Sequence, residues 1–200
     1  MNLEPAAISQ LKSLLCKIIK ECEKEVNKKH GSKDKDENWC QKEQSYPALQ
    51  TTCQNGEQKL INDTKPQTRA QRMGKEKHLC AAEKLNQINK IKGKNGTESK
   101  VSIDHEGCKN NFTRIPGDPG WINPDVIVGN SPNCDGVFDF KTSCPPGKEP
   151  GYGDPGFDPL GIYSSKKSKK YNKQLKRKVY RLICAKGVEP EVIHPETCEE

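Results

Sequence analysis

Ten cysteines in 200 residues constrain the fold of this chain more than any other feature. None of them forms a Cys-x-x-Cys pair and the four histidines are scattered, so we do not expect a zinc site. An even number of cysteines in so polar a chain favours disulfide bonds and an oxidising stage in the life of the protein. Ten unpaired thiols are the alternative. The cysteines stand at positions 16, 22, 40, 53, 80, 108, 134, 144, 184 and 198.

The composition explains why cross-links would be useful. Hydrophobic residues make up 31% of the chain and charged residues 30%, so the core must be modest. A disulfide typically stabilises a fold by about 2–4 kcal/mol. Cys16 and Cys22 would lie about 9 Å apart along the axis of one helix, which is too far for a bond between them. Each is therefore predicted to bond a cysteine elsewhere, with Cys40, Cys53 and Cys80 as the candidates.

The pattern of apolar residues predicts an α/β fold with a small mixed sheet flanked by helices. Residues 1–65 are expected to form an N-terminal extension, made of a helix over 1–24 and an irregular segment that contains cysteines. Residues 66–200 are expected to form the main domain. The apolar side of the first helix is predicted to comprise Leu11, Leu14, Leu15, Ile18, Ile19 and Cys22. The other predicted elements are a helix from Pro66 to Lys92, strands over 101–107, 126–128 and 137–140, a helix over 169–185 and a short strand within 188–195.

Nothing in the sequence predicts insertion into a membrane. No run of 18 apolar residues occurs, so no transmembrane helix is expected. The first residues lack the basic segment and the cleavage site of a secretory signal, so the first helix is predicted to be amphipathic and part of the fold.

Charged residues interrupt two of the predicted strands. Asp125 opens one strand, and Asp139 and Lys141 alternate with Phe138 and Phe140 on the next. Because side chains alternate across a strand, Asp139 and Lys141 share one face while the two phenylalanines can anchor the other in the core. A hairpin would bring Asp125 beside Asp139, and two carboxylates that converge repel each other unless a cation lies between them. Oxygen ligands of this kind suit Mg²⁺ or Mn²⁺.

The stretches Pro124-Asp125 and Asp139-Phe140-Lys141 resemble the motif of the PD-(D/E)XK phosphodiesterases, the restriction-endonuclease-like superfamily. The tripeptide pattern occurs three more times in the chain, but never in an apolar strand that follows a Pro-Asp pair. The resemblance implies a restriction-endonuclease-like core and the hydrolysis of phosphodiester bonds with Mg²⁺ or Mn²⁺. It implies that Asp125 and Asp139 bind the metal, with help from the carbonyl of Phe140. Lys141 would then orient the attacking water and stabilise charge on the phosphate.

Many members of that superfamily add a carboxylate from the helix before the sheet. Glu76 and Glu83 both lie opposite the apolar side of the predicted second helix, and Glu83 is predicted to be the accessory ligand. His78 lies on the apolar side, which is typical of a histidine in the core.

Two cysteines flank the strand that carries Asp139. Cys134 precedes this strand and Cys144 follows it. Disulfide bonds at these positions would brace the candidate site.

The last predicted helix carries most of the net charge of +7. Between residues 165 and 181 there are nine Lys or Arg and no acidic residue, which is typical of a polyanion partner or of a solvated helix face. Lys169, Lys173 and Lys176 are predicted to bind the phosphates of nucleic acid, with DNA as the first expectation and RNA as the second.

A closer resemblance covers roughly residues 70–195. The stretches Asn-Pro-Asp-Val-Ile-Val-Gly-Asn and Phe-Asp-Phe-Lys-Thr-Ser-Cys-Pro-Pro-Gly resemble nuclease toxins of bacterial polymorphic and secretion-system effectors. This resemblance implies an antibacterial effector toxin that is secreted or delivered into a competitor cell. There it would cut nucleic acid in the cytoplasm, and an immunity protein would neutralise it at home.

Three other functions are compatible with the sequence. A non-catalytic nucleic-acid-binding protein would use the basic helix at 166–181. A disulfide-stapled extracellular interaction protein would explain the cysteines but not the basic helix. A Cys-His hydrolase would use His105 and Cys108, although no residue that would orient this pair is visible.

Overall fold

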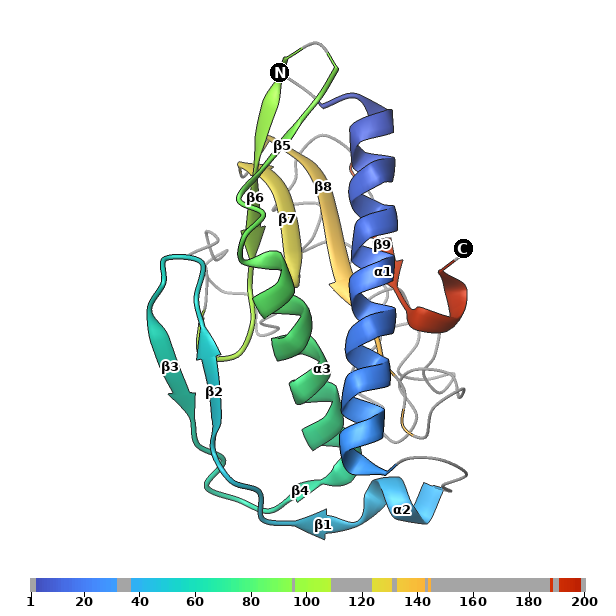
Figure 1. Ribbon diagram of the computed structural model, residues 1–200, viewed down its shortest axis with the longest axis vertical. Coiled ribbons are helices and arrows are strands. Elements are labelled where there is room, and N and C mark those ends of the chain that lie inside the picture. The colour runs from blue at the N-terminus through green and yellow to red at the C-terminus, as the bar shows by residue number, and fades with distance from the viewer. Residues whose placement is uncertain are drawn as a thin grey trace, which may run out of the picture.

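The fold places two long helices, α1 and α3, side by side over one face of a five-stranded sheet (Figure 1). The computed structural model describes residues 3–31, 37–94, 96–108, 124–130, 133–142, 144, 188 and 191–198. The predicted α/β class with helices and small sheets is therefore confirmed. The elements in chain order are α1 Pro5–His30, α2 Glu37–Gln41, β1 Glu43–Gln44, β2 Leu49–Thr52, β3 Gln58–Ile61, β4 Gln67–Thr68, α3 Arg69–Leu85, β5 Lys90–Lys92, β6 Glu98–Ile103, β7 Val126–Asn130, β8 Asn133–Phe140, β9 Glu191–Ile193 and the 3-10 turn η1 Pro195–Thr197.

Helix α1 is longer than the sequence predicted. Pro5 stands at its first position, where a missing N–H costs nothing, and the helix ends at Gly31, whose φ of 66° is left-handed. Five of the six residues predicted for its apolar side are in the core. The exception is Leu14, which is 38% exposed. The buried side of α1 comprises Leu11, Leu15, Ile18, Ile19 and Cys22.

Helix α3 begins later and ends earlier than the predicted Pro66 to Lys92. The side chains of Thr68 and Gln71 each accept a hydrogen bond from the other's backbone N–H, so this capping box sets the first turn. Residues 90–92 then leave the helix and form β5, an edge strand. The predicted extension of the helix through Ile91 is therefore wrong, although Ile91 still packs against the core.

Residues 37–68 contain more regular structure than the predicted irregular segment. Helix α2 is followed by two short antiparallel pairs, β2 with β3 and β1 with β4. Strands of two to four residues that are mostly polar carry no apolar alternation, so the sequence could not reveal them.

The main sheet has the order β5-β6-β7-β8-β9. Its neighbours are antiparallel except β8 and β9, which are parallel, so the predicted mixed sheet is confirmed. The predicted short strand in 188–195 corresponds to β9, and the predicted helix over 169–185 lies outside the described residues. A restriction-endonuclease-like core stays a prediction.

One hydrophobic core joins the helices and the sheet. It contains buried side chains of α1, α3 and four strands of the main sheet, with Phe138 and Phe140 each only 1% exposed. Residues on both sides of the predicted boundary at 65/66 share this core, and that division stays a prediction. No helix in the described part of the chain is long and apolar enough to cross a membrane.

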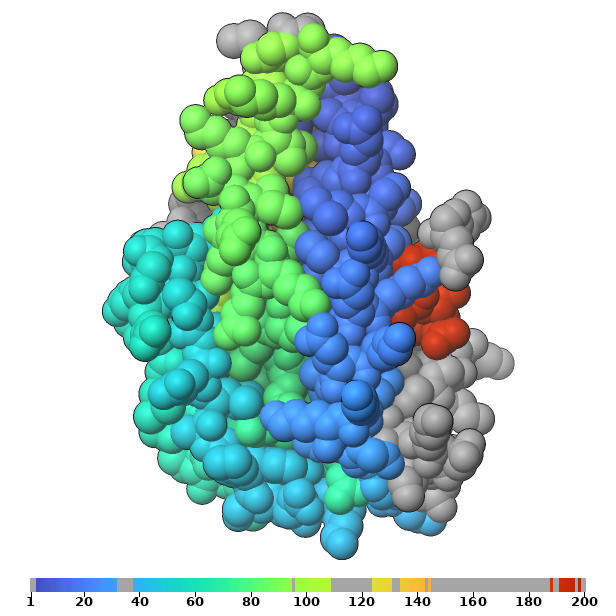
Figure 2. Space-filling model, in the orientation of Figure 1, coloured from blue at the N-terminus to red at the C-terminus, as the bar shows by residue number. Residues whose placement is uncertain are grey.

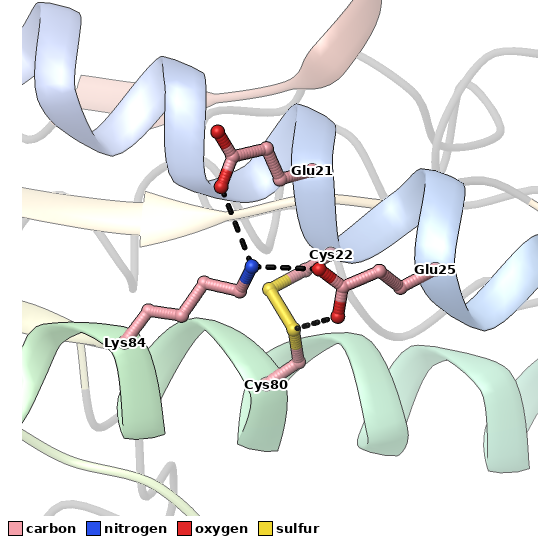
Figure 3. Close-up of a disulfide and its surroundings, with 5 residues drawn as sticks. All are labelled: Glu21, Cys22, Glu25, Cys80 and Lys84. Carbon is pink, nitrogen blue, oxygen red and sulfur yellow. Dashed lines mark hydrogen bonds and ion pairs between the residues drawn. A yellow bond between two sulfur atoms is a disulfide. The ribbon is translucent and has the colours of Figure 1, made fainter.

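Disulfide bonds connect distant parts of the chain, as the cysteine count predicted. Cys22 bonds Cys80 and so joins α1 to α3 (Figure 3), as expected, whereas Cys16 bonds a cysteine outside the predicted set. Cys134 and Cys144 at the two ends of β8 are both disulfide-bonded. The four pairs among the described residues are Cys16–Cys198, Cys22–Cys80, Cys40–Cys144 and Cys53–Cys108.

Candidate active site

The hairpin of β7 and β8 brings the predicted residues together at one end of the sheet. Val126 pairs with Phe138, so Asp125, just before β7, lies beside the end of β8. One carboxylate oxygen of Asp125 (Oδ2) accepts a hydrogen bond from the backbone N–H of Phe140 at 2.5 Å. Asp125 is therefore held directly next to Asp139 and Lys141.

Asp139 and Lys141 form a buried ion pair. The ammonium nitrogen of Lys141 lies 3.0 Å from Oδ2 of Asp139, and the side chains are only 5% and 2% exposed. The backbone N–H of Lys141 donates to the carbonyl of Ile193 in β9, which fixes the end of β8. Burying two charges is costly unless they are paired, and here each charge offsets part of the other's cost.

The two carboxylates hold their protons differently. Burial raises the pKa of Asp139, and the negative charge of Asp125 adds to the rise, against the lowering effect of Lys141, so the value is about 6. Burial also disfavours the charged form of Asp125. The positive charges of His78 and Lys141 and the N–H of Phe140 outweigh this, so the pKa of Asp125 is lowered. The pair therefore tends to hold one negative charge firmly and the second weakly.

His78 of α3 belongs to the same cluster, which the sequence analysis did not predict. Its Nδ1 lies 3.2 Å from Oδ1 of Asp125, and its ring meets the ring of Phe140 edge-on at a centroid distance of 6.2 Å. The side chain is 27% exposed, so it is not a fully buried core histidine. Burial disfavours its charged form, but Asp125 outweighs that effect and raises the pKa of His78.

The signal for His78 was present but ambiguous. Its position three residues before Ala81 puts it on the side of α3 that faces the sheet. Helical spacing alone cannot tell a histidine that fills the core from one that reaches the end of a strand.

Glu76 and Glu83 lie away from these carboxylates. Glu76 is buried in a separate network, where it binds Arg72 at 2.6 Å, Lys29 at 2.8 Å and His30 at 3.2 Å. Glu83 is exposed and, with Glu76, lines a pocket of about 240 Å³ between α3, α1 and β2. The described contacts join neither residue to Asp125, so the predicted accessory role of Glu83 stays a prediction.

The predicted phosphate-binding residues Lys169, Lys173 and Lys176 lie outside the described residues.

A Cys-His hydrolase built on His105 and Cys108 is contradicted, because Cys108 is bonded to Cys53 and a disulfide sulfur offers no thiolate. His105 is buried, and burial lowers its pKa.

The donor set fits a small hard cation. In the described part of the chain, no three His, Cys, Asp or Glu side chains are arranged as a metal site. Mg²⁺ needs fewer protein ligands than that, because it is commonly held by one or two carboxylates together with water and substrate phosphates. Two converging carboxylates, one with a pKa raised by burial and further by the other's charge, are the environment in which a divalent cation would relieve repulsion.

Comparisons with known proteins do not identify a family for this chain. No family model, no curated protein and no solved structure matches the chain.

Proposed function

We propose that this chain is a metal-dependent nuclease, with DNA as its first expected substrate and RNA as the second. The observation that carries the proposal is the convergence of Asp125, Asp139 and Lys141 at the end of the β7–β8 hairpin. A sheet strand normally excludes buried charge, so such a cluster at a strand end is typical of a functional site.

The chain's own residues would divide the work as follows. Asp125 and Asp139 would hold Mg²⁺ or Mn²⁺ with the carbonyl of Phe140, and such an ion polarises phosphate oxygens and lowers the pKa of a bound water. Asp125 is oriented on both carboxylate oxygens, by the N–H of Phe140 and by His78. Lys141 carries a positive charge in a nearly dry site, where it can orient water and stabilise charge that builds on a phosphate.

The biological setting follows the resemblance to bacterial effector nucleases. We propose an antibacterial toxin that is delivered into a competitor cell, acts in its cytoplasm and is neutralised at home by an immunity protein. The disulfide bonds support an oxidising stage before delivery.

A second candidate is an extracellular interaction protein, which the disulfide bonds favour equally. It differs from the first in one respect that can be measured. It has no use for a buried pair of carboxylates with a lysine, and it would cut nothing.

The test is cleavage of supercoiled plasmid DNA and of a structured RNA by the purified, disulfide-bonded chain with Mg²⁺, with Mn²⁺ and with EDTA. We expect cleavage only with a divalent metal, and a loss of at least a hundredfold in the Asp139→Asn and Lys141→Ala variants. Asp135→Asn is the matched control, because Asp135 is on the same strand but binds Ser99 and the backbone of Leu3. Full activity of Asp139→Asn, or equal cleavage in EDTA, would sink the proposal.

A further inference from the structure

The outer face of α1 carries a row of lysines. Lys17, Lys20, Lys24 and Lys28, which we call the lysine stripe, are spaced by three, four and four residues, so they share one side of the helix. Lys20 is half-buried and the other three are exposed. Figure 2 shows α1, in blue, along the face of the molecule with its outer side uncovered in this view.

The acidic residues of α1 do not neutralise the stripe. Glu21 and Glu25 both bind Lys84 of α3, at 3.3 and 2.7 Å (Figure 3). Glu23 points into the protein, where it binds Lys77 at 3.1 Å. The two acids that adjoin the stripe, Glu21 and Glu25, thus share Lys84, which leaves one net negative charge beside the four positive charges of the stripe.

The other two lysines of α1, unlike those of the stripe, form ion pairs. Lys12 binds Glu191 of β9, and Lys29 binds Glu76 of α3. Among the described residues, none of the four stripe lysines forms an ion pair or a hydrogen bond through its side chain. The stripe is therefore a linear array of four lysines that no carboxylate among the described residues pairs with.

The chemistry of the stripe selects its partner. Lysine is depleted in the cores of protein interfaces, which favour aromatic residues, methionine and arginine. A nucleic-acid backbone is bound by positive charges placed along it. Lysine supplies such charges and does not discriminate between bases. From Lys17 to Lys28 the stripe rises by eleven helical steps, or about 17 Å, which equals roughly five base-pair steps of duplex.

We propose that the outer face of α1 is a phosphate-binding surface that holds nucleic acid without regard to sequence. The identity of the polyanion as nucleic acid rests on the proposed nuclease function, whereas the surface itself rests on the charge pattern of α1. It lies in a different part of the chain from Lys169, Lys173 and Lys176, so it would bind the backbone independently of them.

The test is fluorescence anisotropy of a labelled DNA duplex with the full disulfide-bonded chain, in EDTA so that nothing is cut, over a series of salt concentrations. The stripe variant changes all four lysines to Gln, which is also a good helix former. We expect its affinity to fall at least tenfold, and the slope of log affinity against log salt to fall by about three to four units, since each phosphate contact contributes about 0.9.

A matched control removes the same charge from lysines that are paired. Lys12, Lys59, Lys90 and Lys92 each bind a carboxylate that lies away from the stripe, and changing them to Gln lowers the net charge equally. We expect a slope change of less than one unit in this control. Unchanged binding of the stripe variant, or equal losses in the two variants, would overturn the proposal, because the second result means that net charge alone attracts the duplex.

The outcome also separates this surface from the proposed function. A chain that binds through the stripe but cuts nothing in Mg²⁺ or Mn²⁺ would keep the surface and lose the nuclease. A chain that cuts DNA while the stripe variant binds as the wild type does would keep the nuclease and lose the surface.

Discussion

At the scale of single residues, the ionisation of Asp139 is the most distinctive property of the candidate site. Its pKa is about 6 in the folded chain, mainly because of burial, against an ordinary value of 3.8. The protonated form is therefore favoured by folding. The stability that this preference contributes is fully present below pH 3.8 and is lost as the pH rises through about 6.

The first prediction follows from this shift. Without divalent metal, the free energy of unfolding of the wild type minus that of Asp139→Asn should decrease as the pH rises from about 4 to 7. Urea denaturation at four pH values in this range measures it, and the subtraction removes the contribution of carboxylates that do not interact with Asp139. A difference that stays constant across the range would contradict the raised pKa.

The second prediction concerns His78, whose pKa is raised from 6.5 because Asp125 outweighs burial. Its contribution to stability is present below pH 6.5 and is lost as the pH rises through the raised value. The stability of the wild type relative to His78→Gln should therefore fall as the pH rises above about 6.5. His105→Gln is the contrasting variant, because burial lowers the pKa of His105 and reverses the sign.

The relative stability of the wild type against His105→Gln should thus be largest above pH 6.5 and fall as the solution becomes acidic. Equal trends for the two variants would refute the assignment of His78 to the carboxylate cluster. NMR titration of the two imidazole rings gives an independent measurement.

At the scale of elements, α1 offers two adjacent leucines in opposite environments. Leu15 is fully buried and Leu14 is 38% exposed, although the sequence places both on its apolar side. The third prediction is that Leu15→Ala lowers the free energy of unfolding by about 2–5 kcal/mol. Leu14→Ala should cost less, about 1 kcal/mol, because 38% of Leu14 stays in contact with water and less apolar area is buried on folding. Similar losses in urea denaturation would mean that α1 packs differently.

The sequence predicted elements best where one face is apolar over many residues. Helix α1 and the strands β7 and β8 follow such patterns, and the alternation of Phe138 and Phe140 with Asp139 fixed the face of each side chain. The boundaries of α3 were missed because a capping box at Thr68 outweighed the helix signal of Pro66. Short polar strands between 43 and 68 carry no apolar alternation and were missed altogether.

In the candidate site, too, the residues set by local pattern were predicted and the residue set by long-range packing was missed. Asp125, Asp139 and Lys141 could be placed together because strand alternation and a hairpin register need only local information. His78 reaches the cluster through the packing of α3 against the sheet, which depends on contacts far apart in the chain. Spacing along one helix contains no record of such contacts.

At the scale of the whole molecule, the disulfide bonds close loops of very different length. Cys16–Cys198 spans 182 residues and Cys53–Cys108 spans 55. Because a cross-link restricts the unfolded chain more when its loop is longer, the fourth prediction is a ranking. Cys16→Ala with Cys198→Ala should cost up to about 1 kcal/mol more than Cys53→Ala with Cys108→Ala, from the logarithm of the loop lengths, with the upper value reduced because the remaining bonds shorten the loop.

Both double variants should lose about 2–5 kcal/mol relative to the wild type in urea denaturation, and both should keep the α1–α3 bond of Cys22 and Cys80. The reverse ranking would mean that contacts near Cys53 and Cys108, and not chain entropy, dominate the effect of these bonds.

The bond between Cys16 and Cys198 also sets an order of events during synthesis. Helix α1 leaves the ribosome before its partners in the core, which lie in α3, in β6, β7 and β8 and in β9. At roughly 5–20 residues per second, about 10–40 s pass between the emergence of Cys16 and that of Cys198. Until β6, β7 and β8 emerge, the apolar side of α1 has no sheet to cover it, and its cover is complete only when β9 arrives, so the nascent chain offers a binding site for a chaperone during that time.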